Sequence, residues 1–146
     1  MIIRHFKITD YDDVYALWRR TPNMGLNDVD DSREGIGRYL ARNPGTSFVA
    51  EAGGEIIGVI MSGHDGRRGY IHHTCVDGRF RRSGIGARLV GAALGALREE
   101  NISKAALVVF ARNEGGNAFW ERMGFTTRSD LNYRNRALVE LERIDT

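Results

Sequence analysis

The sequence lacks the features that mark secreted and membrane-spanning proteins. It contains a single cysteine, Cys75, which excludes an internal disulfide and fits a reducing compartment. No run of about 18 apolar residues occurs, so no segment is expected to cross a membrane. The start, Met1 to His5, also lacks the apolar segment of a signal peptide. We therefore expect a cytoplasmic protein with no membrane partner.

The chain also lacks a strong charge of either sign. The formal net charge is +2, which is too small to indicate a nucleic-acid partner. With 42% hydrophobic and 27% charged residues in a chain of 146, the composition is that of a single globular domain spanning residues 1–146. The arginines gather locally at Arg79, Arg81, Arg82 and Arg88, which favours a local anion site instead.

Two common phosphate motifs are incomplete in this sequence. The nucleotide P-loop requires a Gly-Lys pair, and the chain has none. The dinucleotide fingerprint requires a third glycine, but Gly84 and Gly86 are followed by Leu89. What is present is the stretch R-R-S-G-I-G-A at residues 81–87, between a predicted strand and a predicted helix. Glycine permits close backbone approach and a helix N-terminus attracts anions, so this stretch predicts a pyrophosphate site.

The hydrophobic pattern predicts a mixed α/β fold. Residues Val14, Leu17 and Trp18 share one helical face, as do Ile36, Tyr39 and Leu40. Thr9 or Asp10 is expected to cap the first of these helices, and Ser32 the second. Strands are expected over residues 2–7, 47–51, 55–63, 70–76, 105–110, 125–131 and 136–141, and helices over residues 10–20, 32–43, 84–101 and 113–123.

The predicted order is β-α-α-β-β-β-α-β-α-β-β. Its strand–helix–strand unit over residues 70–110 requires a parallel pair within an otherwise meandering sheet. This order resembles the GNAT acetyltransferase superfamily, and so do two separate segments. Residues 81–87 resemble the family's acyl-CoA loop, [Q/R]-x-x-G-x-[G/A]. Residues 113–125, N-E-G-G-N-A-F-W-E-R-M-G-F, resemble its N-x-x-A-x-x-[Y/F]-x-x-x-G-F segment.

The resemblance implies an enzyme that transfers an acetyl group from acetyl-CoA, as co-substrate, to a primary amine by direct attack. The acceptor would be a small molecule, a peptide N-terminus or a lysine. In the family, strands four and five splay apart at a bulge in strand four, and the pantetheine arm lies in the gap. The residues that would bind acetyl-CoA are Val76, Arg81, Arg82, Ser83, Gly84, Ile85, Gly86, Ala87, Asn113 and Trp120. His64-Asp65 lacks a third ligand, so we expect no metal.

The chain departs from the family at its catalytic positions. Trp120 occupies the place of the usual tyrosine acid, and residues 107–110 contain no acidic residue. Strand alternation puts His72, Thr74 and Val76 on one face and Ile71, His73 and Cys75 on the other. His72 lies four residues before Val76, the offset at which some arylalkylamine-acetylating members of the family carry a histidine base, so the resemblance makes His72 the candidate base. Tyr133, between the last two predicted strands, is the candidate acid. Because a bulge would disturb the alternation, His73 stays an alternative.

Several simpler interpretations stay open. His72 could be a structural histidine or a substrate contact, and Tyr133 a core residue. The acidic loop at residues 27–31 is either a solvated loop or a surface that attracts a cationic amine. The missing tyrosine favours a second class of function, a catalytically weak or inactive module that binds or senses acyl-CoA. Such folds commonly dimerise, so a homodimer is left open.

Overall fold

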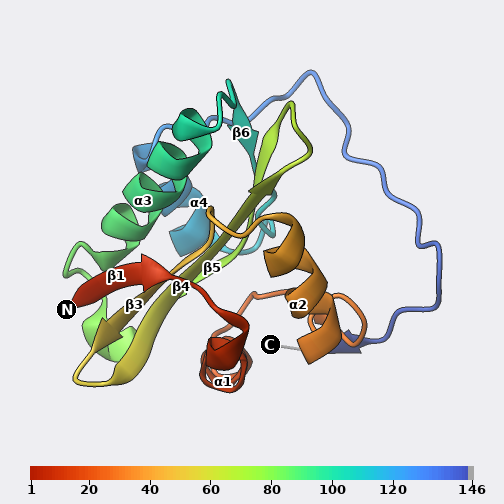
Figure 1. Ribbon diagram of the computed structural model, residues 1–146. Helices are drawn as coiled ribbons and strands as arrows, with labels where there is room; N and C mark the ends of the chain where they lie inside the picture. Colours follow the sequence, from red (N-terminus) through yellow and green to blue (C-terminus); the bar gives the residue numbers. More distant parts are fainter. Residues whose placement is uncertain (145–146) are drawn as a thin grey trace.

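A computed structural model of the chain describes residues 1–144 (Figure 1). Its central sheet has five strands in the order β1-β3-β4-β5-β6, and a separate two-stranded sheet joins β2 to β7. The strands are β1 (Ile2–His5), β2 (Leu26–Asn27), β3 (Phe48–Ala52), β4 (Glu55–His64), β5 (Gly69–Val76), β6 (Ala105–Ala106) and β7 (Arg143–Ile144). The α-helices are α1 (Tyr11–Arg19), α2 (Arg33–Arg42), α3 (Ile85–Glu99) and α4 (Glu114–Arg122); short 3-10 turns cover Ile8–Asp10 and Gly78–Phe80.

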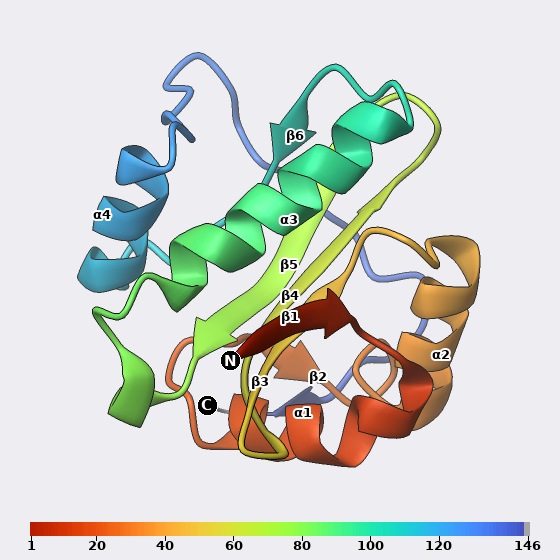
Figure 2. The same cartoon turned by 60° about the vertical axis from the view of Figure 1, so that its left-hand side comes forward.

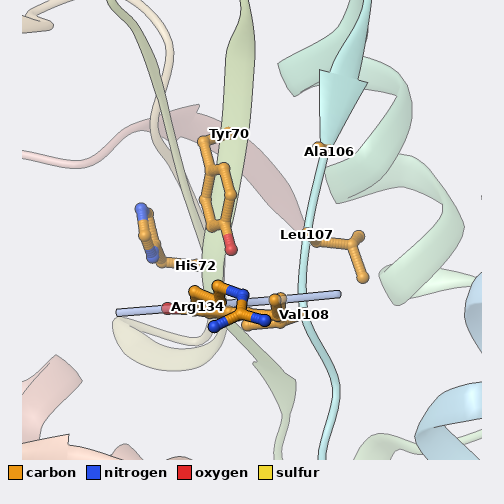
Figure 3. A pocket seen from close by; sticks show the side chains of 7 residues that line it. Tyr70, His72, Ala106, Leu107, Val108 and Arg134 are labelled. Carbon is orange, nitrogen blue, oxygen red and sulfur yellow. The ribbon is translucent and has the colours of Figure 1, made fainter. Parts of the chain in front are cut away.

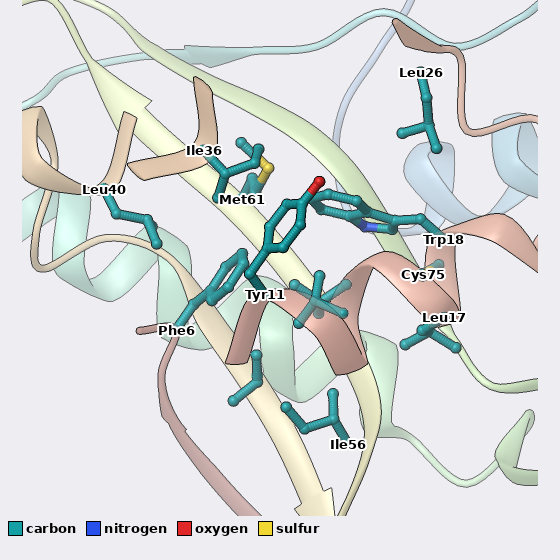
Figure 4. Packing of buried hydrophobic residues seen from close by; sticks show 13 residues of the cluster. Phe6, Tyr11, Leu17, Trp18, Leu26, Ile36, Leu40, Ile56, Met61 and Cys75 are labelled. Carbon is teal, nitrogen blue, oxygen red and sulfur yellow. The ribbon is translucent and has the colours of Figure 1, made fainter. Parts of the chain in front are cut away.

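The helices cover the two faces of the central sheet. Helices α1 and α2 lie on one face, and α3 crosses the other, with α4 beside it (Figures 1 and 2). A core cluster fills each interface, and Figure 4 shows the one under α1 and α2. The predicted faces are confirmed: Val14, Leu17, Trp18 and Ile36 are fully buried, and Leu40 is 8% exposed. None of the helices in the described part of the chain could span a membrane.

The predicted helix cap is confirmed for α2 and wrong for α1. The Ser32 hydroxyl accepts a hydrogen bond from the Gly35 N–H at 3.0 Å, as predicted for the cap of α2. Asp10 occupies the position before α1, but its side chain does not cap that helix. Its carboxylate instead accepts from the Lys7 N–H and from the Arg4 guanidinium, each at 2.9 Å. Asp10 therefore joins the turn before α1 to strand β1.

A bulge in β5 corrects the predicted alternation. Val59 of β4 lies opposite Cys75, and Met61 lies opposite His72. Ile60 is the one residue between Val59 and Met61, so it lies opposite two residues of β5, His73 and Thr74. His73 has a φ of +42°, a conformation that non-glycine residues rarely adopt. The extra residue inverts the faces: Ile71 packs in the α3 cluster, whereas Cys75 packs under α1. The grouping of Ile71 with Cys75 was therefore wrong.

The same bulge separates His72 from Val76. The His72 ring lies against Tyr39 of α2, whereas Val76 packs on the α3 side. The prediction that these two side chains share a face was wrong, because it assumed unbroken alternation through the strand. The bulge also brings His73 to the same face as His72, where the His73 ring lies edge-on to Trp18 of α1.

The splay of the sheet begins immediately beyond β6. Gly69 pairs with Ala105 and Tyr70 with Ala106 in parallel, as predicted, but the strand ends there. Residues 107–110, expected to continue it, form no ladder with β5. The bulge at His73 bends β5, which gives a physical reason for the loss of pairing. The two chain segments therefore part between Tyr70 and Val76.

The predicted closing strand pair over residues 125–131 and 136–141 is wrong. Residues 125–142, which we call the strap, contain no strand and pair with none of the strands of the central sheet (Figure 1). Phe125 anchors one end through its N–H, which donates to the Trp120 carbonyl at 2.9 Å. The other end joins the loop after α1, where β7 pairs with β2 and the Glu142 N–H donates to Asp28 at 2.7 Å. Between these anchors the apolar side chains are exposed, with Leu138 at 92%.

Candidate active site

The loop that precedes α3 is held by the buried carboxylate of Asp77. This residue follows β5 directly, and its side chain is 6% exposed. It accepts hydrogen bonds from the backbone and the guanidinium of Arg79 and from Arg20. These bonds, led by the one from the Arg79 side chain, hold the pKa of Asp77 well below its usual range. Asp77 thereby fixes where the loop leaves the sheet.

The loop presents its backbone toward solvent at the start of α3. Gly84 precedes the helix with a φ of +81°, and Arg82 has a φ of +64°. The first recorded bond of the helix runs from the Arg88 N–H to the Gly84 carbonyl at 3.1 Å. The N–H groups of Ile85, Gly86 and Ala87 therefore have no partner within the helix. Together with the exposed side chains of Arg81, Arg82 and Ser83, they form a site that fits a pyrophosphate.

Gly86 lets α3 approach α4 closely at this point. A Cβ atom there would lie 3.0 to 3.1 Å from the Phe119 ring and 3.8 Å from Val76. Phe119, Trp120 and Val76 all pack against the cluster under α3. Trp120 is edge-on to Phe119 and Phe125, so its ring is part of this packing. Asn113 caps α4, where its side-chain oxygen accepts from the Gly116 N–H at 2.9 Å.

A cavity of about 480 Å³ lies where β5 and β6 part (Figure 3). One wall is β5, one is the segment from Ala106 to Val108, and the strap crosses its mouth. Its lining residues are Tyr70, His72, Ala106, Leu107, Val108, Tyr133 and Arg134. The structure thus brings together His72 and Tyr133, the two candidate catalytic residues, from positions 61 apart in sequence.

His72 stands in an aromatic surrounding that disfavours its charged form. Its ring centroid lies 4.6 Å from that of Tyr70 and 5.8 Å from that of Tyr39. Burial, and secondarily the neighbouring His73, lower the pKa of His72 to about 4. The imidazole is therefore neutral near pH 7 and can accept a hydrogen bond or a proton.

This environment gives a prediction for stability against pH. The folded pKa of His72 is below the unfolded value of 6.5, so the unfolded chain binds more protons between those values. We expect the free energy of unfolding to fall by up to about 3 kcal/mol between pH 6.5 and pH 4 through this group. Urea titrations at several pH values measure it. His72→Gln should flatten this limb, whereas His5→Gln, at an exposed edge strand, should retain it; equal slopes for both would contradict the assignment.

His73 has a different role from His72. Its Nε2 lies 2.7 Å from Oδ1 of Asp31, whose side chain is 4% exposed. The His73 carbonyl accepts from Trp18 Nε1 at 3.2 Å, and the Asp31 carbonyl accepts from the Tyr11 hydroxyl at 2.6 Å. These contacts tie the bulge to α1 and to the loop after it. The Asp31–His73 pair, 42 residues apart, carries no sequence motif by which it could have been predicted.

Two further cavity residues also escaped the sequence analysis. Tyr70 is the second residue of β5. It lies two residues before His72, and residues two apart on a strand point to the same face, which is the one signal that could have placed Tyr70 at the cavity. Burial and the nearby Tyr133 raise the pKa of Tyr70. Arg134 follows Tyr133 directly and lines the same cavity. It was not predicted as a site residue because this segment was expected to form a strand pair.

The fold and the site define a class of protein: a mixed sheet that splits beside an anion-binding helix start, with a cavity in the split. The chain matches the acetyltransferase (GNAT) family over residues 11–125, and it belongs to that family. It is an acetyltransferase of a class that uses acetyl-CoA to acetylate nitrogen.

Relatives agree with this assignment, and solved structures share the fold. The chain is 31% identical to acetyltransferase plu1384 of Photorhabdus laumondii, over 97% of this chain and 99% of that protein. It is 30% identical to acetyltransferase ECA0875 of Pectobacterium atrosepticum, with the same coverage. The crystal structure of Ard1 from Thermoplasma volcanium superposes with a TM-score of 0.78 at 26% identity, over 88% of this chain and 84% of that one. PaiA N-acetyltransferase from Thermoplasma acidophilum, solved with coenzyme A, gives 0.76 at 18% identity, over 87% and 90%.

Proposed function

We propose that the protein acetylates a primary amine by direct attack within the cavity between β5 and β6. The observation that carries this proposal is that His72 and Tyr133 line one cavity. His72 lies on β5, the strand that leads to the anion-binding loop. Val76 lies four residues beyond His72 on the same strand, past the bulge at His73. One strand thus connects the acceptor cavity to the site that suits the pyrophosphate.

Acetyl-CoA, when bound, supplies the activated acetyl group. Residues 81–87 would hold its pyrophosphate, and Val76, Asn113 and Trp120 would line the path of its pantetheine arm. The amine nitrogen forms a bond to the acetyl carbon while the bond from that carbon to sulfur breaks. One proton must leave the nitrogen and one must reach the sulfur. An N–H of β5 near Val76 would stabilise charge on the acetyl oxygen.

His72 and Tyr133 would handle these two protons. With a pKa of about 4, the imidazole of His72 is unprotonated at neutral pH and can accept a hydrogen bond from the amine, directly or through one water. The same low pKa makes it a weak base, so it would take the proton from the nitrogen only once attack on the acetyl carbon has made that nitrogen more acidic. A phenol can donate a proton or a hydrogen bond to the leaving sulfur. Tyr133 is 63% exposed and lies on the strap, so closure of the strap over a bound acceptor would place it.

A thiol-release assay with acetyl-CoA and a panel of amines tests the proposal. We expect turnover with at least one primary amine, a loss of about 100-fold in kcat/KM for His72→Gln and about tenfold for Tyr133→Phe. His5→Gln and Tyr15→Phe, at positions outside the cavity, are matched controls. Unchanged kcat/KM in both cavity variants would refute these roles.

The second candidate is an acyl-CoA-binding module with little catalysis. Trp120 in place of the family's tyrosine, and the exposed position of Tyr133, favour it. Tight CoA binding without turnover of any amine would establish this alternative. Either function is compatible with a homodimer, and light scattering on the purified protein would measure the oligomeric state.

A further inference from the structure

The acceptor cavity carries one positive charge and no negative one. Among its seven lining residues within the described chain, Arg134 is the sole group that is charged at neutral pH, and no Asp or Glu is present. We propose that the acceptor carries a carboxylate close to its amine, as a free amino acid does, and that Arg134 binds this carboxylate. The inference rests on the proposed acetylation of an amine in this cavity.

The acidic loop does not balance this charge. Asp31 is engaged by His73 and by the Asn27 N–H, and Asp28 accepts from the Glu142 N–H. Asp30 accepts from the side-chain amide of Asn27 at 3.0 Å. These carboxylates shape the loop and tie it to the bulge and the strap. None of them lines the cavity, and Asp30 and Asp31 act on His72 only through space and more weakly than burial and His73 do.

Arg134 is available to a ligand. Within residues 1–144 its guanidinium makes no ion pair or hydrogen bond, in contrast to Arg4, Arg20 and Arg79, each of which is paired with a carboxylate. Figure 3 shows the Arg134 side chain crossing the opening between His72 and Val108. A planar guanidinium binds a carboxylate with two parallel hydrogen bonds, which gives both strength and orientation.

The rest of the cavity suits an amino acid with an apolar or aromatic side chain. The neighbouring rings of Tyr70 and His72, tilted by 35° to each other, form one wall, and Ala106, Leu107 and Val108 form the other. The volume of about 480 Å³ accommodates a ligand of this size. Arg134 would hold the carboxylate at the mouth, while the amine is directed toward His72.

The same charge selects among acceptors. A guanidinium a few ångströms from an ammonium group disfavours the charged form unless an anion lies beside the two cations. An acceptor with several positive charges and no anionic group would be repelled by Arg134. An acceptor with its own carboxylate offsets this repulsion and gains the paired hydrogen bonds. The cavity therefore selects for the zwitterion.

Binding to the CoA-saturated protein tests this inference separately from turnover. Isothermal titration would compare N-acetyl-L-phenylalanine with N-acetyl-2-phenylethylamine, which differ by the carboxylate alone. We expect the carboxylate compound to bind at least tenfold tighter. Arg134→Ala should abolish that difference and Arg134→Lys should retain part of it. Arg136→Ala, two residues along the strap and outside the cavity lining, should leave it unchanged.

The outcomes distinguish this inference from the proposed function. Equal affinity for the two compounds, or a preference that survives Arg134→Ala, would overturn the role of Arg134. A carboxylate preference that depends on Arg134, combined with no acetylation of L-phenylalanine or of other amines, would support the binding site and overturn the enzyme proposal. Faster acetylation of 2-phenylethylamine than of L-phenylalanine would leave the enzyme proposal standing and overturn the inference.

Discussion

Replacing Gly84 by valine is expected to weaken acetyl-CoA binding by at least tenfold while the protein stays folded. Gly84 has a φ of +81° directly before α3, and a β-branched residue is strained in that region by about 1–2 kcal/mol. No heavy atom lies within 4 Å of the position where its Cβ would stand, so the change introduces no clash within the protein. The strain is relieved by rotating the backbone, which turns the N–H groups of the helix start away from the pyrophosphate.

The matched control is Gly91→Val in the same helix. Gly91 also has open space around its Cβ position, it lies within the regular part of α3, and it faces His5 and Phe48 rather than α4. Valine there should change the free energy of unfolding by less than about 1 kcal/mol and leave CoA affinity unchanged. Titration calorimetry with CoA and urea unfolding of both variants measure the two effects. A Gly84→Val protein that binds CoA as tightly as the wild type would show that the helix start does not hold the pyrophosphate.

The sequence predicted those parts of the molecule whose structure depends on neighbours along the chain. The faces of α1 and α2, the Ser32 cap and the glycine-rich start of α3 follow from spacing within a few residues, and the structure confirms each of them. The parallel pairing of β5 with β6 also followed, because the intervening α3 leaves a parallel arrangement as the simple solution.

The errors came from interactions between distant residues. The bulge at His73 cannot be read from a strand of alternating character, because Trp18 and Asp31, far away in sequence, help to hold it. Residues 125–131 and 136–141 were predicted to be strands from their residue types, but a strand forms only where a neighbouring strand pairs with it. The residues that follow the strap form β7, which pairs with β2 and not with the central sheet. Arg134 could not be assigned to the cavity for the same reason.

Trp18 is where the fold and the site depend on each other most strongly. Its side chain is fully buried, its ring is edge-on to Phe6 and to His73, and its Nε1 donates to the His73 carbonyl. Trp18→Ala removes the largest buried side chain of the core and should cost about 3–5 kcal/mol. That is a large fraction of the 5–15 kcal/mol typical of a domain, so we expect a much lower midpoint in urea and loss of activity. A midpoint close to the wild-type value would contradict the central place of Trp18 in the core.

Trp18→Phe separates packing from hydrogen bonding. Phenylalanine keeps an aromatic ring against Phe6 but has no donor, so the His73 carbonyl loses its partner at a cost of about 1–3 kcal/mol. Because that carbonyl belongs to the bulge, we expect kcat/KM for an amine to fall by about tenfold in a protein that remains folded. Val90→Ala, which removes buried side-chain volume under α3 on the other face, is the control for stability alone. If Trp18→Phe lost stability but kept full kcat/KM, the bulge would tolerate loosening, and the orientation of His72 would have to be maintained by Tyr39 and Tyr70 instead.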